Sequence, residues 1–321
     1  MPPILPRRSE LVAWAILMMA AGLSACATPA THHPTIAASL GTSSRTSRLE
    51  ASLGQPGTVA FRRVRFATWA GGRGSFIDRD DPRTSAVPPG FEEANIYAYF
   101  VDHPTRGRYL IDAGVSAALE PRLNGIMRRA LADMAVRIDQ TTERLLEGQA
   151  SPRAIFLTHL HFDHIGGLID LDPATPVYLG PGDGAEKNRL NSLLGPPADA
   201  ILEGFGPLQE WAFQGDPDDA FAGVVDIFGD GSIWAIHVPG HSPGSTAYLV
   251  NSVDGPKLVI GDAAHTRLGW EQSMPQPVAA GARLDAETSF ERLRRFADAH
   301  PEVEVFLGHQ SRTGQAEAGV K

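Results

Sequence analysis

The segment AIFLTHLHFDHIGGL, residues 154–168, places three histidines and an aspartate within six positions: His159, His161, Asp163 and His164. The apolar run before them predicts a short buried strand, and the two glycines after them predict a turn. Side chains that leave a tight turn can converge on one point, whereas successive strand residues point to opposite faces of a sheet. The segment therefore predicts a fold in which a strand end presents ligand-type side chains to one site.

The same kind of residue recurs at the ends of later predicted strands. His241 lies in VPGHSPGS, Asp262 and His265 lie in VIGDAAH, and His309 lies in FLGHQ. Loops at one end of a sheet are where a rigid scaffold positions functional groups. Imidazole and carboxylate ligands without a thiol suit Zn²⁺, Mn²⁺, Fe²⁺ or Co²⁺. So many ligands exceed the needs of one ion, and they indicate a two-metal site with its ions about 3.5–4 Å apart.

The remaining pattern is that of one α/β domain, with packed sheets and helices outside them. Strands are expected over residues 57–70, 95–102, 107–114, 154–159, 175–183, 224–240, 245–252, 257–264 and 303–309, and helices over 117–148 and 285–300, the second capped by Asp285. Residues 184–224 are interpreted as an insertion over the site, with Phe205, Trp211 and Phe213 as candidate pocket walls. The net charge of −9 offers no support for nucleic-acid binding, which usually needs a basic face.

The N-terminus has the layout of a secretory signal. Arg7 and Arg8 precede an apolar run at 11–25, and the run ends in LSAC, where Cys26 is the only cysteine of the chain. This segment resembles the lipobox of bacterial lipoproteins, which implies cleavage before Cys26 and acylation of that residue. We therefore expect a signal peptide at 1–25, a flexible tether at 26–56 and a hydrolase domain at 57–321. The location implied is the bacterial cell envelope, with a lipid anchor at the periplasmic face of the outer membrane favoured by Ala27.

Together the motifs resemble the metallo-β-lactamase superfamily. The match comprises HxHxDH at 159–164, PGHSPG at 239–244, GD at 261–262, GH at 308–309 and the earlier LIDAG at 110–114, and it spans roughly residues 58–310. The resemblance implies a four-layer αββα sandwich with its site at one edge of two sheets. It also implies ligand roles: the first metal on His159, His161 and His241, the second on Asp163, His164 and His309, Asp262 bridging both, and Asp112 orienting a ligand histidine.

The function implied is a dinuclear hydrolase, with Zn²⁺ favoured and Mn, Fe or Co as alternatives, that attacks a lactone or ester carbonyl with a metal-bridging hydroxide. Asp163 could in addition relay a proton. β-Lactamases of the superfamily have cysteine or serine where this chain has Asp262, so a β-lactam substrate is disfavoured. Acyl-homoserine lactonases usually place a tyrosine where His265 stands, whereas GDxxH resembles the methyl-parathion-hydrolase branch.

Two alternatives to a lactonase therefore stay open. One is an organophosphate or arylester hydrolase of the same fold, in which His265 contacts a substrate oxygen or braces the site. The other is a non-enzymatic protein of the cell envelope that binds metal or a partner on an inactivated hydrolase scaffold. The partners expected are a small-molecule ester or lactone and, through the lipid anchor, a membrane; the sequence does not specify an oligomeric state.

Overall fold

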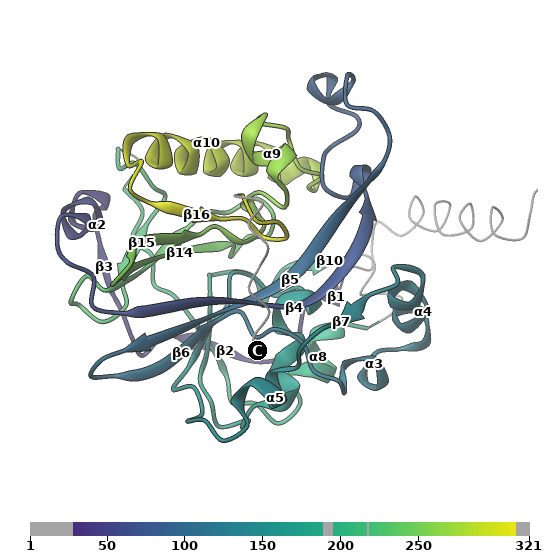
Figure 1. The fold of residues 1–321 in the computed structure, drawn as a ribbon, viewed down its shortest axis with the longest axis horizontal. Coiled ribbons are helices and arrows are strands. Elements are labelled where there is room, and N and C mark those ends of the chain that lie inside the picture. The colour runs from purple at the N-terminus through teal and green to yellow at the C-terminus, as the bar shows by residue number, and fades with distance from the viewer. Residues whose placement is uncertain (1–27, 189–194, 217, 313–321) are drawn as a thin grey trace, which may run out of the picture.

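The computed structural model describes residues 28–188, 195–216 and 218–312, and it contains two mixed β-sheets packed face to face (Figure 1). The larger sheet has eight strands in the spatial order β2 (Thr35–Ala37), β11 (Leu208–Glu210), β9 (Val177–Leu179), β8 (Ile155–Phe156), β6 (Gly107–Ile111), β5 (Phe91–His103), β4 (Ala60–Gly72) and β7 (Arg137–Ile138). The smaller sheet has six: β16 (Glu304–Phe306), β15 (Gly255–Val259), β14 (Thr246–Ser252), β13 (Ile233–His237), β12 (Val224–Asp226) and β3 (Thr42–Ser44). A separate two-stranded ribbon joins β1 (Thr28–Pro29) to β10 (Lys187–Asn188).

Strand direction decides which chain segments meet. In the larger sheet, β6, β8, β9 and β11 are mutually parallel, so the loops that follow them leave from one edge. In the smaller sheet, β15 and β16 are parallel, while β13 and β14 form an antiparallel pair joined by residues 238–245. The aromatic rings of Phe156 and Tyr248 stack between the two sheets with centroids 6.0 Å apart. This inter-sheet core holds the two edges together.

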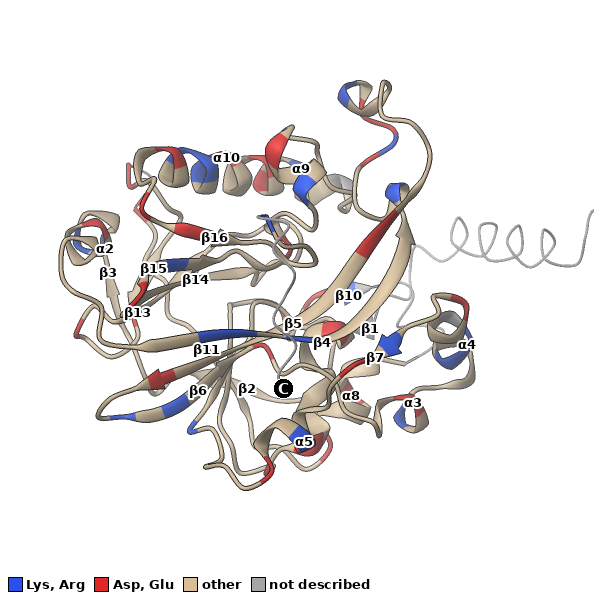
Figure 2. Ribbon diagram, in the orientation of Figure 1, with Lys and Arg blue, Asp and Glu red and all other residues tan. Residues whose placement is uncertain are grey.

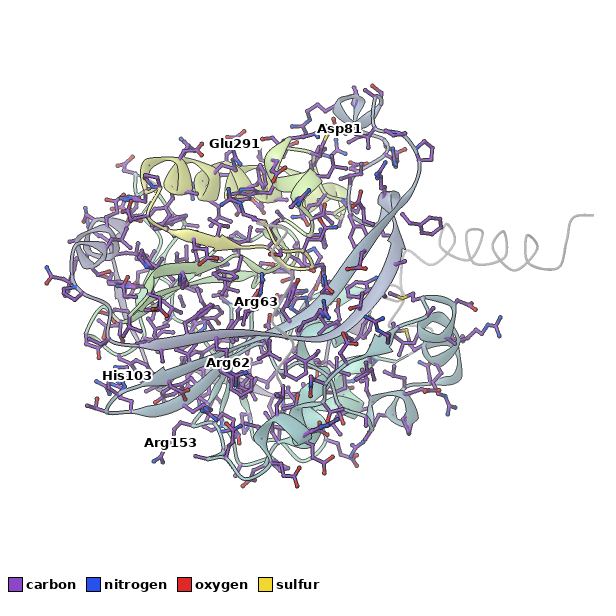
Figure 3. The ribbon with its side chains drawn as sticks, in the orientation of Figure 1. Arg62, Arg63, Asp81, His103, Arg153 and Glu291 are labelled. Atoms are coloured by element: carbon purple, nitrogen blue, oxygen red, sulfur yellow. The ribbon has the colours of Figure 1, made fainter. Side chains whose placement is uncertain are left out.

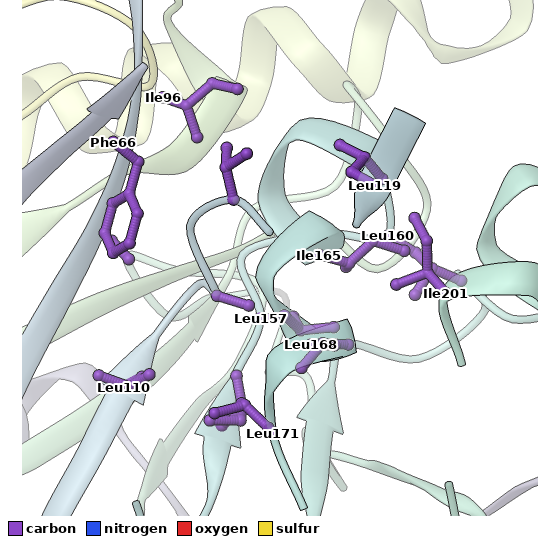
Figure 4. Close-up of a cluster of buried hydrophobic side chains, with 14 of the residues drawn as sticks. Phe66, Ile96, Leu110, Leu119, Leu157, Leu160, Ile165, Leu168, Leu171 and Ile201 are labelled. Atoms are coloured by element: carbon purple, nitrogen blue, oxygen red, sulfur yellow. The ribbon is translucent and has the colours of Figure 1, made fainter. Parts of the chain in front are cut away.

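Helices cover both outer faces, which completes the αββα sandwich that the sequence predicts. The larger sheet is covered by α3 (Leu119–Arg122), α5 (Thr142–Leu146), α6 (Phe162–Ile165) and α8 (Pro197–Ile201), and α4 (Gly125–Asp133) lies nearby. Leu157, Ile165 and Leu168 pack in the resulting outer core (Figure 4). The smaller sheet is covered by α2 (Thr46–Leu53), α9 (Arg267–Glu271) and α10 (Arg283–Ala299). Both acidic and basic residues lie along α10 (Figure 2).

The chain between β4 and β5 forms a long excursion, residues 73–90, that contains the short helices η1 (Arg73–Ser75) and η2 (Pro82–Thr84). Asp81 marks its position on the side of the molecule where α9 and α10 lie (Figure 3). Arg83 bridges the excursion to Glu287 of α10 at 2.5 Å, and Asp78 N–H donates to the Pro275 carbonyl at 2.7 Å. The excursion is therefore held against the smaller sheet's helical layer.

The flexible tether predicted for residues 26–56 is wrong for the part that the structure describes. From residue 28 the chain supplies β2, which pairs in parallel with β11, and β3, which pairs with β12. Leu49 of α2 is fully buried in the smaller sheet's outer core. These short strands lack apolar periodicity because their stability comes from pairing with distant edge strands. The predicted signal peptide and Cys26 lie outside the described residues. Within the described ranges, no helix is long and apolar enough to cross a membrane.

Other sequence expectations need smaller corrections. The region 117–148 contains three short helices and β7 rather than one continuous helix. Helix α10 begins at Arg283, so Asp285 lies inside it and is not its cap. The three candidate pocket walls are core residues instead: Phe205 packs in the larger sheet's outer core, Trp211 donates to the Tyr248 hydroxyl at 3.1 Å between the sheets, and Phe213 stacks on His237.

Candidate metal centre

Five strand ends deliver the site. Strand β6 leads into Asp112, and β8 leads into His159 and then α6, which carries Asp163 and His164 with His161 at its N-cap. The β13–β14 connection contributes His241. Strand β15 leads into η4 (Gly261–Ala263) with Asp262 and then His265, and β16 leads into His309. Because β15 and β16 are parallel neighbours and β6 and β8 are too, these loops share one edge of the sandwich. The structure brings together all the site residues that the sequence predicts there.

The Asp262 carboxylate lies at the centre of this cluster. Five imidazole nitrogens surround its two oxygens at 3.2 to 3.7 Å, namely Nε2 of His309, His265, His241, His164 and His159. Asp262 itself is 5% exposed, so water does not screen these interactions appreciably. A carboxylate with histidines on both sides has the position that a shared ligand of two cations requires.

Two sets of ligand atoms can be separated by distance. His159, His161 and His241 lie with Asp262 in one group, and Asp163, His164 and His309 form another, with the ligand atoms inside each group within 4.8 Å of one another. A third combination joins His265 to Asp262 and His309. The first two groups are the ligand sets that the resemblance implies. The third adds His265, whose role the sequence left open.

Unsatisfied buried atoms test whether these residues suit a metal. Five side-chain atoms in the cluster are buried without a hydrogen-bond partner: Nε2 of His159, Nε2 of His164, Nδ1 of His241, Nδ1 of His265 and Oδ1 of Asp262. Leaving a buried polar atom unpaired costs about 1–3 kcal/mol, so native proteins rarely retain such atoms without a partner. Three of them, Nε2 of His159, Nε2 of His164 and Oδ1 of Asp262, belong to neighbouring groups of the cluster, and such nitrogen and oxygen donors fit divalent cations of the zinc type.

Burial also sets the charge of these groups. It lowers the pKa of His159 and His241 well below the usual range and lowers that of His161, so all three imidazoles are neutral and have a lone pair to donate. Burial alone would raise the pKa of Asp262, but the imidazoles of His309 and His265 outweigh it and hold the pKa well below its usual range. The first group of histidines therefore offers neutral nitrogens beside an ionised carboxylate, which is the protonation state that metal binding needs.

Asp112 supports the cluster from behind. Its backbone has a φ of +56°, and its carboxylate accepts the Thr158 N–H at 2.8 Å and lies 2.8 Å from Nδ1 of His164. Burial disfavours the His164 cation, but the Asp112 carboxylate outweighs burial and raises the pKa of His164 well above its usual range. A cation that binds at Nε2 of His164 must therefore displace a proton. The contact fixes the ring so that Nε2 faces Asp262.

Sequence reasoning missed several supporting residues. The Thr158 hydroxyl lies 3.2 Å from Nδ1 of His159 and 3.0 Å from Asp112, so one hydroxyl links two neighbours of the cluster. Nδ1 of His309 lies 2.9 Å from the Asn95 carbonyl on β5. Thr158 directly precedes the histidine motif and could have been suspected from that position. Asn95 stands 214 residues from His309, and no local pattern marks it.

Aromatic residues from β4 and its excursion form an apolar side of the site. The Trp69 ring meets His309 edge-on with centroids 4.9 Å apart, and the Phe76 ring lies 6.0 Å from His265. Burial lowers the pKa of His265 to about 4, so this imidazole is neutral at physiological pH. His161, Asp163 and His241 are only partly buried, and they mark the side from which solvent reaches the cluster.

Comparison with known proteins agrees with this arrangement. The model of the family described as "Metallo-beta-lactamase superfamily" matches residues 92–309. The "N-acyl homoserine lactonase AttM" of Agrobacterium fabrum is 28% identical over 225 residues, which cover 66% of this chain and 80% of the relative. The "Probable metallo-hydrolase YqgX" of Bacillus subtilis is 41% identical over 111 residues, 32% of this chain and 46% of the relative. A solved quorum-quenching N-acyl homoserine lactone lactonase superposes with a TM-score of 0.56 at 19% identity, covering 82% of this chain and 97% of that one; this likeness concerns the fold.

Proposed function

The chain belongs to the metallo-β-lactamase superfamily, and on this premise we propose that it is a hydrolase which uses two divalent cations to open lactones or esters. The observation that carries the proposal is the Asp262 carboxylate with imidazoles on both sides and unpaired buried donor atoms around it. Unpaired buried donor atoms are costly to retain unless a cation satisfies them, so they support metal binding.

In this proposal His159, His161 and His241 hold one cation, Asp163, His164 and His309 hold the other, and Asp262 bridges them. Nitrogen and carboxylate donors without thiolate favour Zn²⁺, with Mn, Fe or Co as alternatives. When bound, two such cations supply a water of lowered pKa as the nucleophile and positive charge for the oxygen of the attacked carbonyl.

The chain's own residues then position and protect the reacting groups. Asp163 is partly exposed, with its Oδ2 3.6 Å from Nε2 of His309, so it can accept a proton at the open side of the site. Neutral His265, beside Asp262 at 3.4 Å, can donate a hydrogen bond to a substrate oxygen or brace the carboxylate. The Trp69 and Phe76 rings lie against His309 and His265 and shield these imidazoles from water, which strengthens electrostatic interactions in the cluster.

The relatives direct the substrate proposal. AttM proteins carry the name N-acyl homoserine lactonase, so lactones with an acyl-amide substituent are the first substrates to test. A second candidate function is the hydrolysis of organophosphates or aryl esters. It rests on His265, because this histidine completes the GDxxH pattern that resembles the methyl-parathion-hydrolase branch and lies in the cluster with Asp262.

The experiment measures metal content and turnover of the purified full chain. With two equivalents of Zn²⁺ or Mn²⁺, we expect hydrolysis of N-acyl homoserine lactones to exceed that of paraoxon and phenyl acetate. The reverse order would favour the second candidate. Tight metal binding without turnover of any of these substrates would refute the hydrolase and favour a metal-binding scaffold.

The bridging role has its own test. Asp262→Ala should empty at least one of the two sites and remove most of the activity, because both ligand groups depend on that carboxylate. Elemental analysis that finds two ions per chain in this variant would contradict the bridge.

We also propose that the protein is anchored to the bacterial envelope by acylation of Cys26. Support comes from the LSAC segment and the apolar run before it. Cys26→Ser should move the protein from the membrane fraction to the soluble fraction. Continued incorporation of labelled lipid by that variant would refute the anchor.

A further inference from the structure

A second carboxylate, Asp183, is fully buried beside the metal centre but does not belong to it. It follows β9, and its two oxygens accept hydrogen bonds from backbone N–H groups on different loops. Oδ2 accepts the Leu160 N–H at 3.1 Å, and Oδ1 accepts the Gly244 N–H at 2.6 Å. Ser242 contributes a further side-chain hydrogen bond. Since these donors occupy its oxygens, Asp183 is not available as a metal ligand.

The donors to Asp183 are neighbours of proposed ligands. Leu160 lies between His159 and His161, and Ser242 directly follows His241. The histidines of the first proposed site thus come from two loops in different sheets. One loop follows β8 of the larger sheet, and the other connects β13 to β14 of the smaller sheet. Asp183 accepts hydrogen bonds from both loops. The two loops also meet where Nε2 of His241 lies 3.0 Å from Nδ1 of His161.

The loop that carries Asp183 is in direct backbone contact with the β13–β14 connection. A Cβ added to Gly180 would overlap the carbonyl of Gly244, and one added to Gly244 would overlap the carbonyl of Gly180 and lie 2.8 Å from the Asp183 carboxyl carbon. Thr246 N–H also donates to the Thr158 carbonyl at 2.8 Å. Because the loops touch, small changes in the Asp183 contacts are transmitted to the histidines with little slack.

We infer that Asp183 is a positioning residue that sets the distance between His241 and the His159–His161 pair, and thereby the affinity of the first cation site. Only a carboxylate presents two acceptor oxygens to two N–H groups from opposite sides. An asparagine at 183 would present one oxygen and one NH₂ group, which faces an N–H donor and repels it. The inference rests on the proposed two-cation site.

The test compares Asp183→Asn with wild type in two measurements. In metal-free protein, hydrogen exchange of the Leu160 and Gly244 amides should speed up in the variant. In chelator competition with Zn²⁺, one of the two dissociation constants should rise by about 10–100-fold, as is typical when a residue that orients metal ligands is changed. The other constant should stay within about twofold, and the visible spectrum of the Co²⁺ form should change.

Asp226→Asn is the matched control. Asp226 is also a buried aspartate, 5% exposed, that accepts backbone N–H groups from Gly229 and Gly231, but it lies in β12 away from the cluster. Both Zn²⁺ constants should match wild type in this variant. If Asp183→Asn does not fold, Ser242→Ala replaces it. This variant removes a hydroxyl that contacts Asp183 and also lies 2.9 Å from the Ser245 hydroxyl, and the same Zn²⁺ constant should then rise by a smaller factor.

The possible outcomes distinguish a failure of the inference from a failure of the proposed function on which it rests. A folded Asp183→Asn variant, or in its place Ser242→Ala, that binds two Zn²⁺ ions with wild-type constants overturns the inference alone. Wild-type protein that binds no divalent cation overturns the two-cation site and the inference with it. A selective loss of one ion in Asp183→Asn, with Asp226→Asn unchanged, supports the inference.

Discussion

A substitution at Gly308 tests the geometry around Asp262, because it should disturb the metal site more than it lowers the stability of the fold. Gly308 directly precedes His309, and its backbone is not in the left-handed region, so alanine can adopt its conformation. A Cβ at 308 would lie 3.0 Å from the Gly261 carbonyl oxygen and 3.2 Å from the Asp262 carboxyl carbon, and it would overlap the Asp262 Oδ1 atom outright. Gly308→Ala therefore acts on the central carboxylate while it leaves every proposed ligand in the sequence.

The expected magnitude follows from that overlap. Real Cβ atoms do not approach oxygen closer than 3.0 Å, so the Asp262 carboxylate must move by on the order of 1 Å. A displacement of this size in an active site can cost about 10²-fold in rate. The cost in folding is smaller: an extra methyl in a packed site costs about 1–3 kcal/mol, and the loss of glycine's freedom in the unfolded chain returns about 0.4–1 kcal/mol.

The assay combines kcat/KM for a lactone, zinc content and the free energy of unfolding in urea. We expect Gly308→Ala to stay folded, to lose about 10²-fold in kcat/KM and to bind less than two ions per chain. Gly206→Ala is the control, because nothing lies within 4 Å of a Cβ there and its backbone is also permissive. A Gly308→Ala variant with two bound ions and at least half of the wild-type kcat/KM would refute the placement of Asp262.

Three further predictions follow from the packing and the site. Leu49→Ala should lower the free energy of unfolding in urea by about 2–5 kcal/mol, because Leu49 is fully buried. Leu284 is 74% exposed, so Leu284→Ala should change that free energy by less than about 0.5 kcal/mol. Equal effects of the two variants would mean that residues 46–53 do not pack on the domain. Asp112→Asn should weaken Zn²⁺ binding by about 10–100-fold in chelator competition, because it disturbs the contacts with Thr158 and His164, and unchanged binding would contradict this role. Removal of metal with EDTA should lower the melting temperature, and added zinc should restore it, because a ligand at 1,000 times its Kd stabilises the native state by about 4 kcal/mol. An unchanged melting temperature in calorimetry would argue against a resident metal.

Much of the architecture could be predicted because it depends on short-range patterns. Apolar runs mark strands such as 95–102, and the ligand residues follow directly after such a run in AIFLTHLHFDH. A motif of this kind specifies both its local structure and its chemistry, since the turn after the strand is what lets His159, His161 and Asp163 converge. An α/β domain of packed sheets with helices outside, and ligand residues gathered at strand ends, were accessible from the sequence for this reason, whereas the four-layer αββα order was implied by the resemblance to the superfamily.

Other features were decided by pairing between distant segments, which no local pattern encodes. The segment 28–56 has the composition of a tether, yet it adds edge strands to both sheets, because partner strands exist there only after the rest has folded. Likewise the apolar side of the site comes from Trp69 in β4 and Phe76 in the excursion after it, not from the 184–224 region that the composition suggested.

The sequence by itself determined which residues could bind metal and which strand ends carry them. The tertiary structure alone decided that Asp262 is surrounded by five imidazoles, that Asn95 orients His309 across 214 positions, and that Asp183 joins the loops of two sheets. The physical reason is that strand and turn formation depend on neighbouring residues. The distances inside the site depend instead on how two sheets pack, and that packing is a property of the whole chain.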